Sequence, residues 1–167
     1  QRAFRSRPQI DFSFKPQLWF NNPKEMLDDT NHNYDLILRK NGEFEKVDVK
    51  ELISDNVDQM AFVGKIHWVG IAERYFVNAV IFPEPVNAEV VIRKVSHFDY
   101  KVSIALAEKD FIAGKADNID YSVYSGPKLA SALSQYKGYL DESIDYGVLT
   151  PICQFLLWVM GMCYQLV

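Results

Sequence analysis

The chain has 167 residues, and its 18 Lys and Arg residues against 22 Asp and Glu residues give a formal net charge of −4. This length fits one domain with a sizeable core, and the content of 49% hydrophobic and 24% charged residues excludes a disordered chain. The acidic balance argues against nucleic acid as a partner, because nucleic-acid binding needs a clustered basic face. Since the chain begins with Gln1 and shows no hydrophobic leader, we expect a processed fragment of a longer protein.

The first half of the chain predicts short strands. Residues 10–14 alternate between apolar and polar side chains, which is typical of a half-buried strand. Two further alternating runs, 34–39 and 44–49, flank the pair Asn41 and Gly42. An Asn-Gly pair between such runs is a strong signal for a β-hairpin.

The second half continues this pattern. Residues 75–82 are nearly all apolar, which predicts a central strand that is buried on both faces and is ended by Pro83 and Pro85. The chain therefore holds about seven or eight short strands with no long helix between them, and this spacing favours an antiparallel β-sandwich or barrel over a parallel α/β fold. The remaining predicted strands cover residues 60–69, 89–95, 100–106 and 119–123.

After the strands, the hydrophobic period changes to that of a helix. Gly126 and Pro127 resemble a helix start, since Pro is favoured at the first helical position. An apolar stripe with helical spacing follows, which predicts an amphipathic helix near residues 127–140. The stripe consists of Leu129, Leu133, Tyr136 and Leu140.

The end of the chain carries no charge. Asp145 is the last charged residue, and residues 146–167 contain no Asp, Glu, Lys, Arg or His. Residues 151–167 would form a helix of roughly 25 Å, which is borderline for a membrane span of ~20 apolar residues. Three interpretations stay open at this point: a buried core helix, a transmembrane segment and a helix that lies on a membrane surface.

The polar residues of this segment favour the third interpretation. They fall within a ~60° arc of a helical wheel, which leaves a wide apolar face, and Trp158 and Tyr164 could anchor that face at a membrane interface. The polar stripe consists of Thr150, Gln154, Gly161 and Gln165. Cys153 and Cys163 are too far apart on one helix to form a disulfide and are predicted to be small buried hydrophobic residues.

The sequence contains no motif that would support catalysis. No spacing of the HxxxH, CxxC or GxSxG kind occurs, no glycine-rich phosphate loop is present, and the histidines are scattered. We therefore predict no catalytic residue, no cofactor and no metal, and favour a binding, anchoring or scaffolding role.

Two stretches resemble a known family. Residues 67–79 (HWVGIAERYFVNA) are similar to a segment of the large periplasmic domain of YidC, the bacterial inner-membrane protein insertase, and Trp68, Tyr75 and Phe76 carry the match. Residues 124–147 resemble the C-terminal "GPK…L…DYG" segment of the same domain. The second match consists of Gly126, Pro127, Asp145, Tyr146 and Gly147.

The resemblance implies a β-supersandwich of the galactose-mutarotase type, of which this chain holds either the C-terminal part or a shortened form. It implies a sandwich domain over residues 1–146 and an amphipathic, membrane-interfacial helix over residues 147–167. In the family, an aromatic-rich amphipathic helix follows the second motif, and we assign its position here to a set of interface residues. This set consists of Phe155, Leu156, Leu157, Trp158, Met162 and Tyr164.

The function implied by the resemblance is that of a non-catalytic domain of a membrane-protein insertase and chaperone. The domain would face the periplasm at the bacterial inner membrane, and its partners would be the lipid bilayer surface, the Sec translocon and nascent membrane-protein clients. The alternative is a carbohydrate-binding or mutarotase-like domain, because sugar epimerases share the supersandwich fold. That activity needs a histidine and a carboxylate in one cleft, and His67 or His97 with Glu73 or Glu89 are the candidates.

Overall fold

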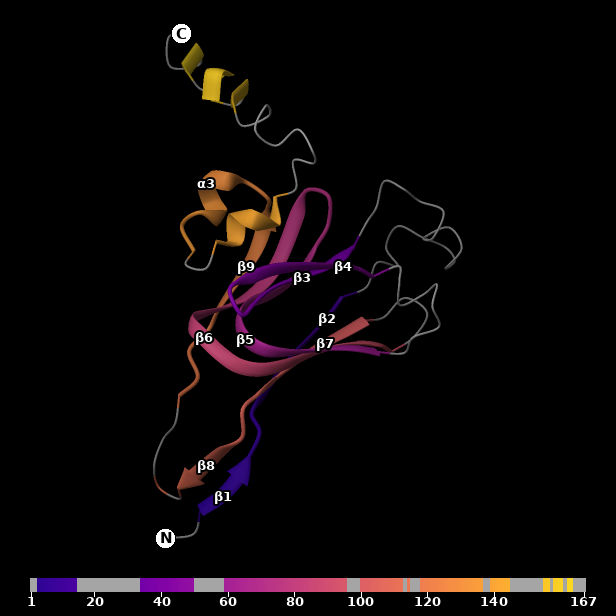
Figure 1. Ribbon diagram of the computed structural model, residues 1–167, viewed down its shortest axis with the longest axis vertical. Coiled ribbons are helices and arrows are strands. Elements are labelled where there is room, and N and C mark those ends of the chain that lie inside the picture. Colours follow the sequence, from indigo (N-terminus) through magenta and orange to yellow (C-terminus); the bar gives the residue numbers. More distant parts are fainter. Residues whose placement is uncertain are drawn as a thin grey trace.

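The computed structural model describes residues 3–14, 34–49, 59–95, 100–112, 114, 118–136, 139–144, 155–156, 158–160 and 162–163. These residues form a mainly antiparallel β structure, as the sequence predicts, with one seven-stranded sheet and one two-stranded ribbon (Figure 1). The sheet has the order β2-β7-β6-β5-β3-β4, and β9 also pairs with β6. Its strands are β2 (Gln9–Phe14), β3 (Asp35–Lys40), β4 (Glu43–Asp48), β5 (Gln59–Ala72), β6 (Phe76–Lys94), β7 (Tyr100–Leu106) and β9 (Ser122–Pro127).

Two long strands, β5 and β6, hold the sheet together. The first part of β6 pairs with β9, and its last part, from Ala88 onward, pairs with β7. The register between β5 and β6 shifts between Ile66 and Trp68, since Ile66 pairs with Val86 whereas Trp68 pairs with Ile81. Irregularities of this kind let a strand bend and pass from one layer of a sandwich to the other.

The shift corrects one prediction. Pro83 and Pro85 do not end the strand, because β6 continues through them to Lys94. Residues 82–85 have no pairing partner in the ladders that β6 makes with β5, β7 and β9. A bulge is a place where a strand tolerates proline, which has no backbone N–H to donate. The predicted strands 75–82 and 89–95 are therefore two halves of one bent strand.

The main core lies inside the bend. It includes Leu36 and Leu38 of β3 together with Ile104 of β7, and Ile10 and Phe12 of β2 pack against it. Since β2 and β3 lie toward opposite edges of the sheet, their contact with one cluster means that the sheet folds over on itself. This arrangement is consistent with the predicted β-sandwich.

A second, smaller core covers the opposite side of β3, β5 and β6. It contains Trp68 and Ile81, and two short helical elements close it with Leu133 and Leu140. These elements are α3 (Ala130–Leu133) and the 3-10 helix η2 (Leu140–Ser143). Residues 79–82 of β6 are buried in succession, and they alternate between the two cores. The prediction that this strand is buried on both faces is confirmed for these residues.

The helix predicted near residues 127–140 is much shorter in the structure. Gly126 and Pro127 belong to β9, and α3 begins only at Ala130. Tyr139, just before η2, has a left-handed backbone with φ of 59°, a conformation that interrupts a right-handed helix. The apolar stripe was nevertheless informative, because Leu133 and Leu140 are both fully buried.

The turns and edges differ in how well the sequence predicts them. The hairpin of β3 and β4 is confirmed, with φ of 55° at Asn41 and 89° at Gly42, the left-handed pair that the two-residue hairpin turn requires. The last strand was predicted at residues 119–123 but lies at Ser122–Pro127.

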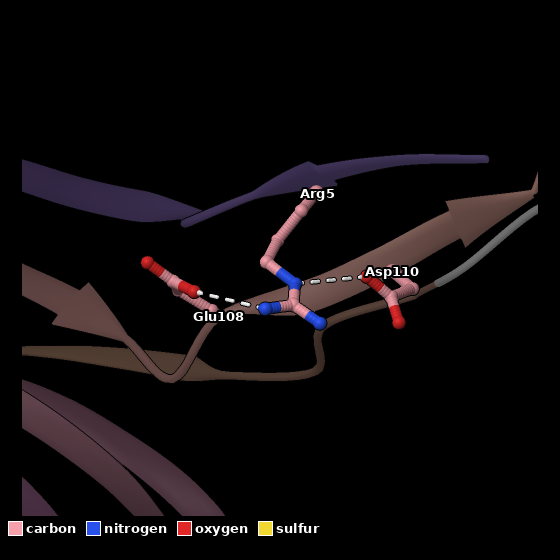
Figure 2. A network of polar contacts seen from close by, with 3 residues as sticks. All are labelled: Arg5, Glu108 and Asp110. Carbon is pink, nitrogen blue, oxygen red and sulfur yellow. Dashed lines mark hydrogen bonds and ion pairs between the residues drawn. The ribbon is translucent and has the colours of Figure 1, made fainter.

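Among the described elements, a projecting ribbon is one that the sequence patterns do not predict. It consists of β1 (Ala3–Ser6) and β8 (Lys109–Ile112), and it lies at the end of the molecule opposite α3 (Figure 1). The guanidinium of Arg5 on β1 lies 3.1 Å from the carboxylate of Asp110 on β8 and 4.0 Å from that of Glu108, just before β8 (Figure 2). These charges are exposed, so the ion pairs add little to stability and mainly keep the ribbon soluble.

Candidate functional site

The charge-free end presents large apolar side chains to the solvent. Residues 155–156, 158–160 and 162–163 are helical. Phe155 is 60% exposed, Leu156 53%, Trp158 61%, Met160 67% and Met162 48%. The rings of Phe155 and Trp158 stack at a centroid distance of 6.2 Å, so both lie on one side of the segment. Exposed apolar side chains in such a run mark a surface for a membrane or for another protein.

These exposures bear on the alternatives that the sequence left open. A core helix would bury these side chains, so the exposed ones do not fit that interpretation. Cys163 is exposed, which corrects the prediction of a buried residue. No helix among the described residues has the length and apolar character needed to cross a bilayer. Two of the predicted interface residues, Leu157 and Tyr164, lie outside the described residues, as do Cys153 and the four residues of the polar stripe.

The residues of the first motif divide between core and surface. Trp68 is fully buried in the smaller core, where its ring lies 6.0 Å from that of Phe44. Tyr75 and Phe76 lie at the turn between β5 and β6 and are exposed. The backbone N–H of Glu73 donates to the carbonyl of Phe76 at 2.8 Å and closes this turn.

The second motif lies directly beside the first. Pro127 pairs with Phe76 and Gly126 pairs with Val77 in the ladder of β6 and β9. The hydroxyl of Tyr124 donates to the carbonyl of Pro127 at 2.7 Å, next to Gly126. The described parts of the two motifs therefore lie side by side in the sheet. Asp145, Tyr146 and Gly147 lie outside the described residues.

A polar clamp joins the helical elements to the sheet. Arg39 of β3 forms an ion pair with Glu142 of η2, and its guanidinium lies 4.6 Å from the ring centre of Tyr139. The Arg39 side chain is largely buried, which strengthens its electrostatic contacts. This clamp fixes η2, which closes the smaller core just before residues 145–167.

A buried carboxyl group lies close to the turn of the first motif. Asp35 pairs with Ala72 at the end of β5, and the ammonium group of Lys46 lies 3.3 Å from its carboxylate. Burial raises the pKa of Asp35, and the charge of Lys46 opposes this effect. The pair anchors the hairpin of β3 and β4 beneath the turn.

A cavity of about 390 Å³ lies between β2, β6 and β9. Residues 10–13 of β2 line it in succession, so the edge of this strand, rather than one of its faces, borders the space. Within the described part of the chain, β2 pairs only with β7, and β9 pairs only with β6. The apolar lining includes Ile10, Phe12, Val80, Tyr121 and Val123.

Among the described residues, the candidates for sugar chemistry, His67 with Glu73 or Glu89, are not brought together. Glu89 forms an ion pair with Arg7 at 2.9 Å and pairs with Val63, which lies about 13 Å along β5 from His67. Glu73 is six positions beyond His67, at the end of the same strand. His97 lies outside the described residues. Within the described ranges, no group of His, Cys, Asp and Glu side chains is arranged to hold a metal ion.

Comparison with known proteins agrees with the two motifs. Residues 8–159 match the YidC periplasmic domain family. The chain belongs to this family. Membrane protein insertase YidC of Dechloromonas aromatica is 27% identical over 118 residues, which cover 70% of this chain and 22% of that protein. The YidC protein of Nitrosococcus oceani is 26% identical over 125 residues, which cover 75% of this chain and 22% of that protein.

A third relative is more similar over a shorter stretch. The YidC protein of Thiobacillus denitrificans is 30% identical over 100 residues, which cover 60% of this chain and 18% of that protein. The chain thus matches about a fifth of the length of these YidC proteins. Its family membership makes it a domain related to membrane insertases.

Proposed function

We propose that this chain is the non-catalytic periplasmic domain of a membrane-protein insertase at the bacterial inner membrane. In this proposal, the domain docks on the lipid bilayer surface through its C-terminal segment and contacts membrane-protein clients and the Sec translocon. The observation that carries the proposal is the run of exposed apolar side chains in a segment without charged residues.

Physical chemistry supports a membrane surface as the partner of this segment. Exposed Phe155, Leu156 and Trp158 would gain free energy by entering the boundary between headgroups and acyl chains. Tryptophan is enriched at this depth because its ring is apolar and its N–H is polar. The β body carries all the charged residues, so it remains in water while the segment binds.

Vesicle flotation of the full chain tests this function. We expect the chain to float with vesicles of phosphatidylcholine and phosphatidylglycerol, and the double variant Phe155→Ser/Trp158→Ser to remain at the bottom. The control is Val63→Ser, because Val63 is at least as exposed but lies on β5. Far-ultraviolet circular dichroism should be the same for all three proteins. Equal flotation of the double variant and the unchanged chain would contradict the proposal.

Client contact is assigned in this proposal to the cavity between β2 and β9. Its apolar lining and its two strand edges suit an extended apolar segment, which would add as a strand and place alternate side chains in the cavity. A photocrosslinker at Val123 should label a short biotinylated peptide of alternating apolar residues, and one at Val63 should not. Equal labelling from both positions would reject this cavity as the contact site.

A further inference from the structure

The turn between β5 and β6 and the chain after β9 form an exposed apolar tip. The backbone N–H of Lys128 donates to the carbonyl of Tyr75 at 2.8 Å, and Pro127 pairs with Phe76. The N–H of Leu129 donates to the carbonyl of Pro127 at 2.9 Å. These contacts hold Tyr75, Phe76 and Leu129 at one place, although they come from segments far apart in the sequence. We call these three residues the aromatic tip.

The side chains of the aromatic tip are largely in solvent. Tyr75 is 63% exposed, Phe76 52% and Leu129 56%, whereas Val77 and Leu133, their neighbours along the chain, are fully buried. Single exposed apolar residues are common on protein surfaces, but adjacent large ones from two segments point to a partner. The fold does not need these three side chains for its core.

The charges around the aromatic tip favour an anionic partner. Arg74 is exposed, and its guanidinium lies 5.3 Å from the ring centre of Tyr75. Glu73 is only half-exposed, whereas Arg74 is exposed, so the cation is the more accessible of these two charges at the turn. An arginine beside tyrosine and phenylalanine suits the headgroup region of an anionic bilayer, where the rings enter the interface and the guanidinium meets phosphate.

The position of the aromatic tip also favours a bilayer. The turn between β5 and β6 lies beside α3, at the end of the molecule opposite the ribbon of β1 and β8 (Figure 1). The helical residues of the C-terminal segment lie beyond this same end (Figure 1). A flat bilayer that contacts the segment could therefore reach the aromatic tip as well.

We infer that the aromatic tip is a second membrane-contact surface, which inserts Tyr75, Phe76 and Leu129 into the interface of an anionic lipid bilayer beside Arg74. This inference rests on the proposed docking of the domain, because one contact alone would let the domain rotate about its C-terminal segment. Two contacts would fix the face that the sandwich turns toward the membrane.

Flotation of full-chain variants tests the aromatic tip separately from the C-terminal segment. With vesicles of phosphatidylcholine and phosphatidylglycerol, Tyr75→Ser/Phe76→Ser should lower the partition coefficient about ten-fold, whereas Val63→Ser should not change it. Arg74→Glu should lower it about five-fold with these vesicles and leave binding to phosphatidylcholine alone unchanged. Unchanged partition of the tip variants would overturn the inference.

A fluorescent label reports directly on depth. In a Cys153→Ser/Cys163→Ser background, an environment-sensitive dye on Tyr75→Cys should shift to the blue when the anionic vesicles are added, and a dye on Val63→Cys should not. If the dye at position 75 did not shift while the chain still floated, the aromatic tip would not be a membrane contact and the proposed function would stand. If Phe155→Ser/Trp158→Ser floated like the unchanged chain and the tip variants did not float, docking through the C-terminal segment would be contradicted and membrane contact at the aromatic tip supported. If the dye at position 75 shifted to the blue only when a protein was added, and not with the vesicles, the inference would also be overturned.

Discussion

Trp68 and Trp158 are the same residue type in opposite surroundings. Trp68 lies on β5, is fully buried and packs among side chains of the sheet and of α3 and η2. Trp158 lies in the charge-free end, is mostly exposed and stacks only on Phe155 among the rings that the structure describes. The first tryptophan belongs to the core, whereas the ring of the second is exposed and lies outside both cores.

The contrast extends to the two regions around them. Residues 1–145 contain every charged residue of the chain, and most of the charged residues that the structure describes lie at the surface around an apolar interior, which is the usual pattern of a domain in water. The C-terminal segment exposes apolar side chains and has no charge. The cost of exposing such side chains is recovered only when another apolar phase covers them. Burial thus distinguishes the residues that stabilise the body from those to which the proposed function assigns docking.

Replacing each tryptophan by alanine tests most strongly whether Trp68 stabilises the fold and Trp158 does not. Trp68→Ala should lower the free energy of unfolding by about 3–5 kcal/mol, because it leaves a cavity in the smaller core. Trp158→Ala should change it by less than about 0.5 kcal/mol, because the side chain is exposed. Urea unfolding followed by circular dichroism measures both changes. Similar losses in the two variants would show that the C-terminal segment is packed on the body.

A second variant tests how closely the strands of the body approach. A Cβ atom on Gly70 would lie 2.5 Å from the carbonyl oxygen of Asn78 and 2.9 Å from the Cβ of Ala79, on the neighbouring strand. Gly70→Ala should therefore cost about 1–3 kcal/mol of stability through overpacking, although alanine suits a strand no worse than glycine. Gly64→Ala is a milder comparison, because the atoms it meets belong to side chains of Lys40 and Asn41. A smaller loss in Gly70→Ala than in Gly64→Ala would contradict the close approach.

The clamp at Arg39 tests the junction between the two regions. A double-mutant cycle of Arg39→Met and Glu142→Gln should give a coupling free energy of about 1 kcal/mol, since Arg39 is largely buried and Glu142 is partly so. The cycle is measured by urea unfolding, with Lys40→Met and Glu45→Gln as a matched pair that lies at 2.7 Å within the hairpin. Coupling that is indistinguishable from zero would mean that η2 is not held to β3 by this contact.

The smallest expected effect on stability comes from removing the charge of Asp11 on β2. Hydrogen bonds from Lys101, first of all, and from Gln9 lower the pKa of Asp11 from 3.8 to about 2. A carboxyl group whose pKa is lower in the folded state stabilises the fold at pH values above its unfolded pKa. Asp11→Asn should thus cost less than about 1 kcal/mol near neutral pH, since the pair is partly exposed. This difference from the unchanged chain should vanish between about pH 4 and pH 2, as urea unfolding at several pH values would reveal.

Local sequence patterns predict the strands and turns of the β body wherever a single pattern determines the structure. Alternation predicts β2, β3 and β4, and the Asn41-Gly42 pair predicts the hairpin turn, because both signals depend on neighbours in sequence. Proline misled the prediction for β6, since Pro83 and Pro85 sit in a bulge that only the register with β5 reveals. The stripe at Leu133 and Leu140 was read as one helix, but two short elements around a left-handed Tyr139 bury the same side chains.

The surfaces were harder to predict than the core. The absence of charge in residues 146–167 was visible in the sequence, whereas the role of Phe155 and Trp158 as interface residues stays a prediction, and the structure adds that both side chains are exposed. The aromatic tip was not predicted, because Tyr75 and Phe76 read as part of a buried strand. Only the pairing of Phe76 with Pro127 brings Leu129 beside them. The cavity between β2 and β9 likewise depends on long-range topology and leaves no local pattern.

Quenching of tryptophan fluorescence by brominated lipids tests the central claim most directly, because bromine quenches only rings that enter the bilayer. The chain contains a third tryptophan, Trp19, so the measurement uses a Trp19→Phe background. The Trp19→Phe chain, mixed with vesicles of brominated phosphatidylcholine and phosphatidylglycerol, should lose a large part of its emission. The Trp19→Phe/Trp158→Phe variant, which keeps an apolar ring at position 158, should bind the vesicles but show almost no quenching. Trp68 is fully buried and should contribute none. Equal quenching in both proteins, or no quenching in either, would contradict docking through the C-terminal segment.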